Sequence, residues 1–348
     1  MKISNQEING ENGAFIIAEI GQAHDGSLGM AHSFIEAVAA AGANAIKFQT
    51  HIAKAESTLD EPFRVPLSGQ DENRFQYWKR MEFTEEQWQD LANHAKKRNL
   101  IFLSSPFSIE AVVLLSKIGM PAWKIGSGEV FNYPLIDQII QKGDPILLSS
   151  GMSNWDQITK SVEYIQNRGA NLALFQCTSK YPTSLDEIGL NILEEIKSRY
   201  NNVPNGLSDH SGTLWPSLAA LSQEVDFIEV HVTFDKGMYG PDSSSSINFK
   251  ELKLICEANK AFTKMRQNPI DKDLFSKEIT GTKSLFTKSL SPKYDLPIGT
   301  IIEEEMISLK KPSGGLTMEE INKIKGKKLK KPLSSNHIIK HEDLKNIF

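Results

Sequence analysis

The stretch Ile46-Lys47-Phe48-Gln49-Thr50 decides the fold class, because it sets polar side chains at alternate positions of a short apolar run. Side chains alternate between the two faces of a strand, so Lys47 and Gln49 share one face while Ile46 and Phe48 share the other. Comparable runs, rich in Ile, Val, Leu and Phe, lie at 15–20, 45–49, 101–105, 123–127, 146–150, 172–177, 206–210 and 227–232. Such short runs are typical of strands buried on both faces, as in a parallel sheet.

Longer amphipathic segments separate these runs, at 28–41, 84–97, 109–118 and 155–168. Gly42, Asn99, Gly119 and Gly169 follow them, and these are residue types that end helices. Eight strand–helix units within about 250 residues predict a (β/α)8 TIM barrel. An open, doubly wound α/β sheet can be written from the same pattern, but the count of eight units favours the barrel.

The sequence predicts a TIM-barrel domain at 1–270, a linker at 271–284 and a small, mostly β domain at 285–348. The last part is rich in lysine, and Pro and Gly separate its short extended pieces at 289–291, 301–302 and 338–339. Within the barrel, the connection from 50 to 84 far exceeds the usual ~2–6 residues. Its cationic and aromatic residues predict a lid or specificity loop; they are Arg64, Arg74, Phe75, Tyr77 and Trp78.

Composition indicates an ordinary globular protein of 348 residues with a net charge of -4, which argues against a nucleic-acid partner. Its two cysteines, Cys177 and Cys256, form neither a disulfide framework nor a CxxC metal site. No apolar run approaches the ~20 residues that span a bilayer, and the first residues lack a signal-peptide core. We therefore expect a cytoplasmic protein without a membrane partner.

Polar groups fall near the C-terminal ends of nearly all the predicted strands, and in a barrel these ends converge on the mouth where the chemistry occurs. They are Glu19, Lys47, Ser105, Lys124, Ser149, Ser208, His210 and His231. A charge inside an apolar strand is costly unless it is compensated, so Lys47 and Lys124 predict an anionic ligand. His210 and His231 suit either a divalent transition metal or two hydrogen-bonded core histidines, and position alone leaves both interpretations open.

Eight motifs occur in order along the chain: Ile17-Ala-Glu-Ile-Gly21, Ile46-Lys-Phe-Gln49, Phe102-Leu-Ser-Ser-Pro-Phe107, Lys124-Ile-Gly-Ser-Gly-Glu129, Leu148-Ser-Ser-Gly-Met152, Gln176-Cys-Thr178 with Tyr181-Pro182, Leu207-Ser-Asp-His210 and Gly240-Pro-Asp242. Together they resemble the sialic acid synthase (N-acetylneuraminate synthase) family over nearly the whole chain. The part after Lys288 resembles the small antifreeze-like (SAF) domain of that family. The resemblance implies condensation of phosphoenolpyruvate with an N-acetylated sugar aldehyde, giving a nine-carbon 2-keto acid and phosphate.

The resemblance also implies roles for individual residues. Phosphoenolpyruvate would be held by Lys47, Ser105, Lys124, Ser127, Ser149, Ser179 and Ser208. The open-chain sugar would contact Glu19, Gln49, Tyr181, Asp242 and Lys311. His210 and His231 would bind a divalent metal, Mn²⁺ in the first place and Mg²⁺ or Co²⁺ as alternatives, which polarises the aldehyde oxygen. Glu129 would be the general base that activates water, with Glu19 as a second catalytic residue.

This chain departs from the family pattern on the sugar side, at Ala23, Ser179, Val230 and Lys311. Many relatives have Asn at the first two of these positions, Lys or Arg at the third, and Arg at the fourth. A lysine cannot reproduce the planar fork of a guanidinium. The resemblance further implies a domain-swapped homodimer in which the small domain of one subunit, through Lys311, closes the barrel of the other.

Several alternatives to a sialic acid synthase stay open. A related enzyme of legionaminic, pseudaminic or spore-coat polysaccharide synthesis would use a different sugar. A Schiff-base aldolase is an alternative, because Lys124 lies on a barrel strand in an apolar setting. An ice-binding or ligand-binding protein would explain the antifreeze-like tail, but it leaves the polar residues at the strand ends without a purpose.

Overall fold

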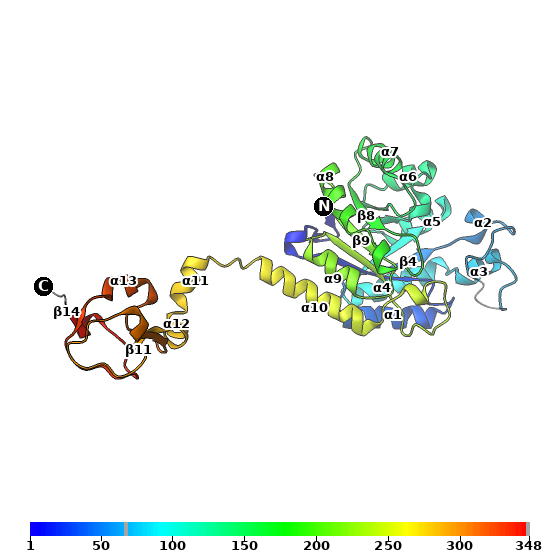
Figure 1. Cartoon of the computed structure of the whole chain (residues 1–348). Coiled ribbons are helices and arrows are strands. Elements are labelled where there is room, and N and C mark those ends of the chain that lie inside the picture. Colours follow the sequence, from blue (N-terminus) through cyan, green and yellow to red (C-terminus); the bar gives the residue numbers. More distant parts are fainter. Residues whose placement is uncertain (66–68, 346–348) are drawn as a thin grey trace. The chain divides into compact units, whose positions relative to one another are not determined.

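The computed structural model describes residues 1–65 and 69–345, and the chain divides into two compact units, Met1–Asn268 and Pro269–Phe348 (Figure 1). The first unit contains an eight-stranded sheet whose strands are all parallel. Its order is β5-β4-β3-β10-β9-β8-β7-β6, and the two end strands, β5 and β6, lie against each other. The sheet is therefore a nearly closed barrel, which confirms the predicted (β/α)8 fold.

The barrel strands follow the predicted runs closely. They are β3 Phe15–Gly21, β4 Ala45–Thr50, β5 Ile101–Pro106, β6 Trp123–Ile125, β7 Ile146–Ser149, β8 Leu172–Cys177, β9 Asn205–Asp209 and β10 Phe227–His231. The expectation for 123–127 was too long, because the chain leaves the strand at Gly126 and forms a 3-10 turn at Ser127–Glu129. That turn brings Ser127 and Glu129 to the mouth of the barrel.

Helices cover the outside of the barrel: α1 Leu28–Ala41, α4 Glu85–Lys97, α5 Ile109–Ile118, α6 Tyr133–Ile140, α7 Trp155–Gln166, α8 Asn191–Arg199, α9 Trp215–Ser222 and α10 Phe249–Arg266. Their ends are set by local chemistry. The hydroxyl of Ser27 accepts from the Met30 N–H at the start of α1, and Gly42 ends that helix in the left-handed conformation. Thr84 and Gln87 form a capping box at the start of α4.

Two apolar layers leave only one end of the barrel free for polar groups. Side chains that point outward, including Ile46, Phe48 and Val230, pack between the strands and the helices. Side chains that point inward fill the lower barrel, and they include Phe15, Phe175 and Phe227. The hairpin of β1 Lys2–Ile3 and β2 Gln6–Glu7 adds Ile3 and Ile8 to this inner layer. Polar side chains on the inner face are thus confined to the carboxyl ends of the strands.

The long connection after β4 has helical structure of its own. It contains α2 Ala53–Glu56 and α3 Arg74–Met81, and Ala53, Tyr77, Trp78 and Met81 form a small apolar cluster within it. The ring of His51 is stacked between Trp78 and Phe107, with centroid distances of 3.8 Å and 4.4 Å. This stack anchors the connection against the strand ends of the barrel.

The second unit combines helices and short strands around its own core. It contains α11 Lys272–Glu278, α12 Thr280–Phe286, β11 Ser289–Pro292, β12 Ile307–Lys310, α13 Ile321–Ile324, β13 Lys328–Leu329 and β14 Leu344–Lys345. Its core includes Leu290, Ile302, Ile324, Leu329 and Ile339. The extended piece expected at 301–302 makes only an isolated bridge, and 338–339 is not a strand. Within 1–65 and 69–345, no helix has the length and apolarity needed to cross a bilayer.

Candidate active site

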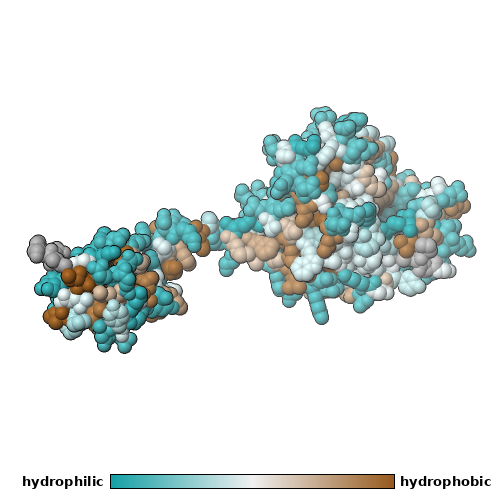
Figure 2. Space-filling view, in the orientation of Figure 1, coloured by the Kyte–Doolittle hydropathy of each residue, from teal (hydrophilic) through white to brown (hydrophobic). Residues whose placement is uncertain are grey.

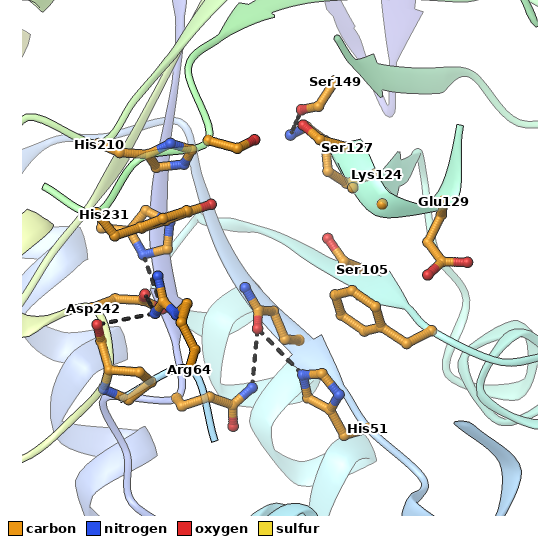
Figure 3. A pocket seen from close by; sticks show the side chains of 18 of the residues that line it. His51, Arg64, Ser105, Lys124, Ser127, Glu129, Ser149, His210, His231 and Asp242 are labelled. Carbon is orange, nitrogen blue, oxygen red and sulfur yellow. Dashed lines mark hydrogen bonds and ion pairs between the residues drawn. The ribbon is translucent and has the colours of Figure 1, made fainter. Parts of the chain in front are cut away.

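A cavity of about 500 Å³ opens at the carboxyl ends of the barrel strands (Figure 3). The wall on one side, here called the lysine end, is formed by Lys47, Ser105, Lys124, Ser127, Ser149 and Ser208. The wall on the other side, here called the histidine end, is formed by Gln49, Tyr181, His210, His231 and Asp242. The cavity therefore receives side chains from most of the barrel strands, as expected for strand-end polar groups that converge on one mouth.

Two buried lysines at the lysine end share one carboxylate. Lys124 Nζ lies 3.0 Å from Glu229 Oε1 and donates to Ser149 Oγ at 2.6 Å. Lys47 Nζ lies 3.7 Å from Glu229 Oε2 and donates to Ser105 Oγ at 3.2 Å. Both lysines are only 3% exposed, so their charges are almost fully withdrawn from water. These lysines and their hydroxyl partners Ser105 and Ser149 line the cavity, and the anionic ligand expected from the two lysine positions stays a prediction.

Glu19 is the second carboxylate beside Lys47. It is fully buried, forms an ion pair with Lys47 and accepts from Gln49 Nε2 at 3.1 Å. Burial raises the pKa of Glu19 to about 7, since the opposing attraction of Lys47 does not offset the desolvation and the nearby Glu229 adds to it. Burial also acts to raise the pKa of Glu229, but Lys124 and Lys47 outweigh it and hold that pKa below its ordinary value. Glu229 is therefore the carboxylate that stays ionised.

Hydroxyls and one glycine form a concave surface next to Lys124. The Gly151 N–H donates to Ser127 Oγ at 3.1 Å. A β-carbon added at Gly151 would lie only 2.4 Å from Ser179 Oγ and 2.8 Å from Cys177 Sγ and Ser127 Oγ. The absence of a side chain at this position keeps the surface open, and its hydroxyl donors beside a buried lysine suit a phosphate or carboxylate group.

The two imidazoles at the histidine end lie close together, with ring centroids 5.2 Å apart. His210 Nδ1 lies 2.9 Å from the carbonyl oxygen of Thr178, so Nδ1 carries the proton and Nε2 keeps its lone pair. His231 Nδ1 is buried and has no hydrogen-bond partner among the described residues. Burial lowers the pKa of His231 to about 3, so this ring is neutral at physiological pH. A divalent transition metal requires a neutral imidazole, and the His231 ring is already in that form.

Cys177 lies beside His210, with 3.7 Å between Sγ and Nδ1. Burial disfavours the charged form of both groups. Their mutual attraction outweighs it, so the pKa of Cys177 is lowered and the pKa of His210 is raised. Within 1–65 and 69–345, no cluster of three or more His, Cys, Asp or Glu side chains has the arrangement of a metal site. Any metal at the histidine end would need water or substrate for its remaining ligands.

The long connection after β4 reaches the histidine end through Arg64. Its Nη2 donates to Asp242 Oδ1 at 2.5 Å and to the Pro241 carbonyl at 3.0 Å. The guanidinium lies over the ring of Tyr181, 4.3 Å from the centroid. Tyr181 in turn packs on His210 at a centroid distance of 4.2 Å.

Glu129 lines the cavity on the side opposite His210, His231 and Asp242 (Figure 3). Its Oε2 accepts from Asn132 Nδ2 at 2.7 Å, which holds the carboxylate in place at the end of the 3-10 turn. The ion pairs of Lys47 and Lys124 among the described residues are with Glu19 and Glu229, so Glu129 lines the cavity without being part of that buried network.

The structure brings nearly all the predicted site residues into this one cavity. Glu19 contacts it indirectly, through Lys47 and Gln49. Lys311 belongs to the second unit, where its Nζ lies 4.8 Å from the centroid of the Phe286 ring, and its role stays a prediction. Of the departures from the family pattern, Ser179 lines the cavity, whereas Ala23 and Val230 pack in the outer core and are not part of its wall.

Sequence reasoning missed Glu229, gave no site role to His51 or Cys177, and placed Arg64 only in a predicted lid or specificity loop. All four residues line the cavity. Glu229 could have been found from the sequence, because it lies two residues before His231 on β10 and so shares its face, as Lys47 shares a face with Gln49 on β4. Arg64 carries no such signal, since its partner Asp242 is 178 residues away.

Comparisons with known proteins match both parts of the chain to described families. The model of the NeuB family matches residues 34–271, and the model of the SAF domain matches residues 287–345. N,N'-diacetyllegionaminic acid synthase of Campylobacter jejuni subsp. jejuni is 33% identical over 93% of this chain and 98% of its own length. N-acetylneuraminate-9-phosphate synthase of Homo sapiens is 28% identical over 97% and 95%.

Among solved structures, N-acetylneuraminic acid (sialic acid) synthetase from Leptospira borgpetersenii serovar Hardjo-bovis is similar, with a TM-score of 0.71 and 29% identity. The similarity covers 82% of this chain and 96% of that one. The predicted family and the antifreeze-like tail are thus both confirmed. The chain belongs to the NeuB family of sialic-acid-type synthases and carries a SAF domain at its C-terminal end.

Proposed function

We propose that the protein condenses phosphoenolpyruvate with an N-acetylated amino-sugar aldehyde, giving a nine-carbon 2-keto sugar acid and phosphate. The observation that carries this proposal is the division of one cavity into two chemically different ends. Two buried lysines and four serine hydroxyls suit a small, highly charged anion such as phosphoenolpyruvate. The histidine end, with amide, phenol and imidazole groups, suits a polyhydroxylated aldehyde.

In this reaction Lys47 and Lys124 hold the phosphate and carboxylate of phosphoenolpyruvate, and the serine hydroxyls orient them. Both lysines face the ionised carboxylate of Glu229, and the second carboxylate beside Lys47, Glu19, has a pKa raised to about 7 and can take up a proton. With Glu19 protonated, the two lysines carry more charge than Glu229 neutralises, so the site is preorganised for an anion. Fixing the enol beside the aldehyde converts a bimolecular reaction into an effectively unimolecular one.

The bond that forms joins C3 of phosphoenolpyruvate to the aldehyde carbon, and the aldehyde oxygen takes up a proton. Positive charge then develops at C2, and water adds there as Glu129 accepts its proton. The tetrahedral C2 centre then expels phosphate with its bridging oxygen and loses its hydroxyl proton, which leaves the open-chain 2-keto acid; this acid can close to a cyclic hemiketal afterwards. General base catalysis of this kind is worth about 10²–10⁴-fold.

His210 and His231 are the residues that would hold a divalent metal, with Mn²⁺ the first candidate and Mg²⁺ or Co²⁺ the alternatives. The buried, unpartnered Nδ1 of His231 and the lone pair left on His210 support this assignment. A bound metal would act as a Lewis acid that polarises the aldehyde oxygen. Activity lost in chelator and restored by added Mn²⁺ would support the assignment; full activity in metal-free buffer would contradict it.

Two acceptor classes compete. The first is an N-acetylmannosamine-like aldehyde, as the resemblance to sialic acid synthases implies. The second is a diacetylated sugar that leads to a legionaminic-type product, and the name and the 33% identity of the Campylobacter relative favour it. A screen of both classes that follows phosphate release from phosphoenolpyruvate decides between them. Absence of phosphate release with every N-acylated aldehyde would overturn the proposed reaction.

A Schiff-base aldolase is less well supported. Lys124 Nζ is held between Glu229 and Ser149, an arrangement that suits a cation that binds an anion rather than an amine that attacks a carbonyl. Borohydride reduction in the presence of substrate tests this alternative, since an aldolase would be trapped as a covalent adduct and a synthase would stay active.

We further propose that the protein works as a homodimer in which the SAF domain of one subunit closes the barrel of the other. Exposed apolar side chains around α11 and α12, among them Ile270, Leu274, Leu285 and Phe286, support this proposal (Figure 2). Several large exposed apolar side chains within one short segment are typical of a surface that another protein covers. Light scattering that gives a monomer mass at micromolar concentration would contradict it.

A further inference from the structure

Arg64 is the cation of the histidine end, and its position is set by three independent contacts. Nη2 donates to Asp242 Oδ1 and to the Pro241 carbonyl, and the guanidinium carbon Cζ lies 4.3 Å from the centroid of the Tyr181 ring. A guanidinium fixed by a carboxylate, a carbonyl and an aromatic face loses little rotamer freedom when it binds a ligand. The side chain is therefore a preorganised hydrogen-bond donor in the cavity wall.

Only one of the guanidinium nitrogens, Nη2, is used in these bonds, so within the described part of the chain Nε and Nη1 keep their N–H groups for another acceptor. Arg64 lines the cavity together with Tyr181 and His231. Asp242 Oδ2 lies 3.9 Å from His231 Nδ1, so Asp242 connects Arg64 to the imidazole of His231. An oxygen of the acceptor that lies against Tyr181 is within reach of this donor.

The cations around Arg64 are already paired with carboxylates. Arg64 itself is paired with Asp242, and Arg74 Nε lies 3.1 Å from Glu61 Oε1. Glu56, which also lines the cavity, lies 2.5 Å from His51 Nδ1. Each of these described cations already has a carboxylate partner, so this part of the wall offers little net positive charge to a phosphate group, whereas a neutral carbonyl oxygen needs only an N–H donor.

We propose that Arg64 is a specificity-determining residue, which binds the carbonyl oxygen of an uncharged N-acyl substituent of the acceptor sugar. This role rests on the proposed condensation reaction and narrows its substrate class to N-acylated acceptors without a phosphate group. A guanidinium supplies the planar donor geometry for such an oxygen, which a lysine cannot reproduce.

The chain offers a matched control in Arg80. It ties the same connection to another barrel loop, with Nη1 2.7 Å from Asp25 Oδ1 and Nη2 2.7 Å from Asp71 Oδ2, and it also lies over a tyrosine, 5.4 Å from the Tyr77 centroid. Arg80 is not part of the cavity wall formed by the described residues. Arg80→Lys therefore reproduces the loss of an arginine that fastens the connection without removing the donor at the histidine end.

The test is steady-state kinetics of phosphate release by the full-length enzyme with Arg64→Lys, Arg80→Lys and wild type. The acceptors are N-acetylmannosamine, its 6-phosphate and mannose, which lacks the N-acyl group. Arg64→Lys is expected to raise the KM for N-acetylmannosamine by about 10- to 100-fold, the range for one charged hydrogen bond. The KM for phosphoenolpyruvate stays within about twofold, because the lysine end is untouched.

Three results would overturn the role of Arg64. They are an unchanged acceptor KM in Arg64→Lys, an equal rise in Arg80→Lys, and an equal rise for mannose. Preference of the wild type for the 6-phosphate would overturn the uncharged acceptor. A wild-type enzyme that releases no phosphate with any aldehyde would overturn the reaction as well, so the two failures are distinguishable.

Discussion

Replacement of Glu229 by glutamine tests whether this carboxylate stabilises the charges of the two buried lysines in the protein without substrate. The carboxylate is 3% exposed, and it contacts both Lys124 and Lys47 and accepts from Ser208 Oγ at 2.9 Å. Glutamine keeps the size and one acceptor oxygen, but it removes the charge and replaces the other oxygen with an NH2 group. A buried ion pair that loses one partner costs about 3–5 kcal/mol, so we expect the free energy of unfolding to fall by about that amount in the absence of ligand.

Phosphoenolpyruvate provides the decisive second condition, because its negative charges would replace the missing carboxylate. The free energy of unfolding is measured by urea unfolding followed by circular dichroism, with and without saturating phosphoenolpyruvate. We expect the ligand to reduce the difference in this free energy between wild type and Glu229→Gln. Glu129→Gln is the matched control, since it makes the same chemical change in the same cavity without a lysine partner. Our reasoning is refuted if Glu229→Gln is as stable as wild type, or if the ligand leaves the gap unchanged.

The remaining predictions concern the base, the concave surface and pH. Glu129→Gln is expected to lower kcat by about 10²–10⁴-fold with little change in the KM for phosphoenolpyruvate, and retained turnover would exclude it as the base. Gly151→Ala places a methyl group against Ser127, Ser179 and Cys177, so isothermal titration should show binding of phosphoenolpyruvate weakened at least ~10-fold; unchanged affinity would contradict the assigned surface. The pKa of Glu19 is raised to about 7 in the folded protein, so the folded state binds this proton more tightly than the unfolded state does. The stability that this proton contributes is fully present below about pH 4.5, and it is lost as the pH rises to about 7. Between pH 4.5 and 7, wild type should therefore lose up to about 3 kcal/mol of unfolding free energy relative to Glu19→Gln. If the unfolding free energies of the two proteins change with pH in the same way, the pKa of Glu19 is not raised.

Much of the fold follows from periodicity alone. The alternation in β4 and β10 sorts side chains between the inner cavity and the outer core, so Lys47 and His231 could be placed at the mouth without a structure. The same rule explains why Val230 faces away from the site even though its neighbours in sequence do not. Strand ends at a sharp change of direction were less predictable, as the 3-10 turn after Ile125 shows.

Long-range partners could not be read from the sequence. Glu229 joins Lys124 across 105 residues, and Arg64 joins Asp242 across 178 residues. Neither pair has a local pattern, because closure of the barrel and the course of the connection after β4 decide which charges meet. The two-residue strands of the second unit were missed for a related reason, since a strand that short has no detectable alternation.

The most direct test of the proposed chemistry is the fate of the oxygen that bridges C2 and phosphorus in phosphoenolpyruvate. The enzyme is incubated with phosphoenolpyruvate labelled with ¹⁸O at that position and with an N-acylated aldehyde, and both products are analysed by mass spectrometry. If water adds at C2 and phosphate leaves with the bridging oxygen, the label appears in phosphate, with one phosphate formed for each 2-keto acid. Label retained in the sugar acid would show cleavage of the phosphorus–oxygen bond and would contradict the proposed reaction.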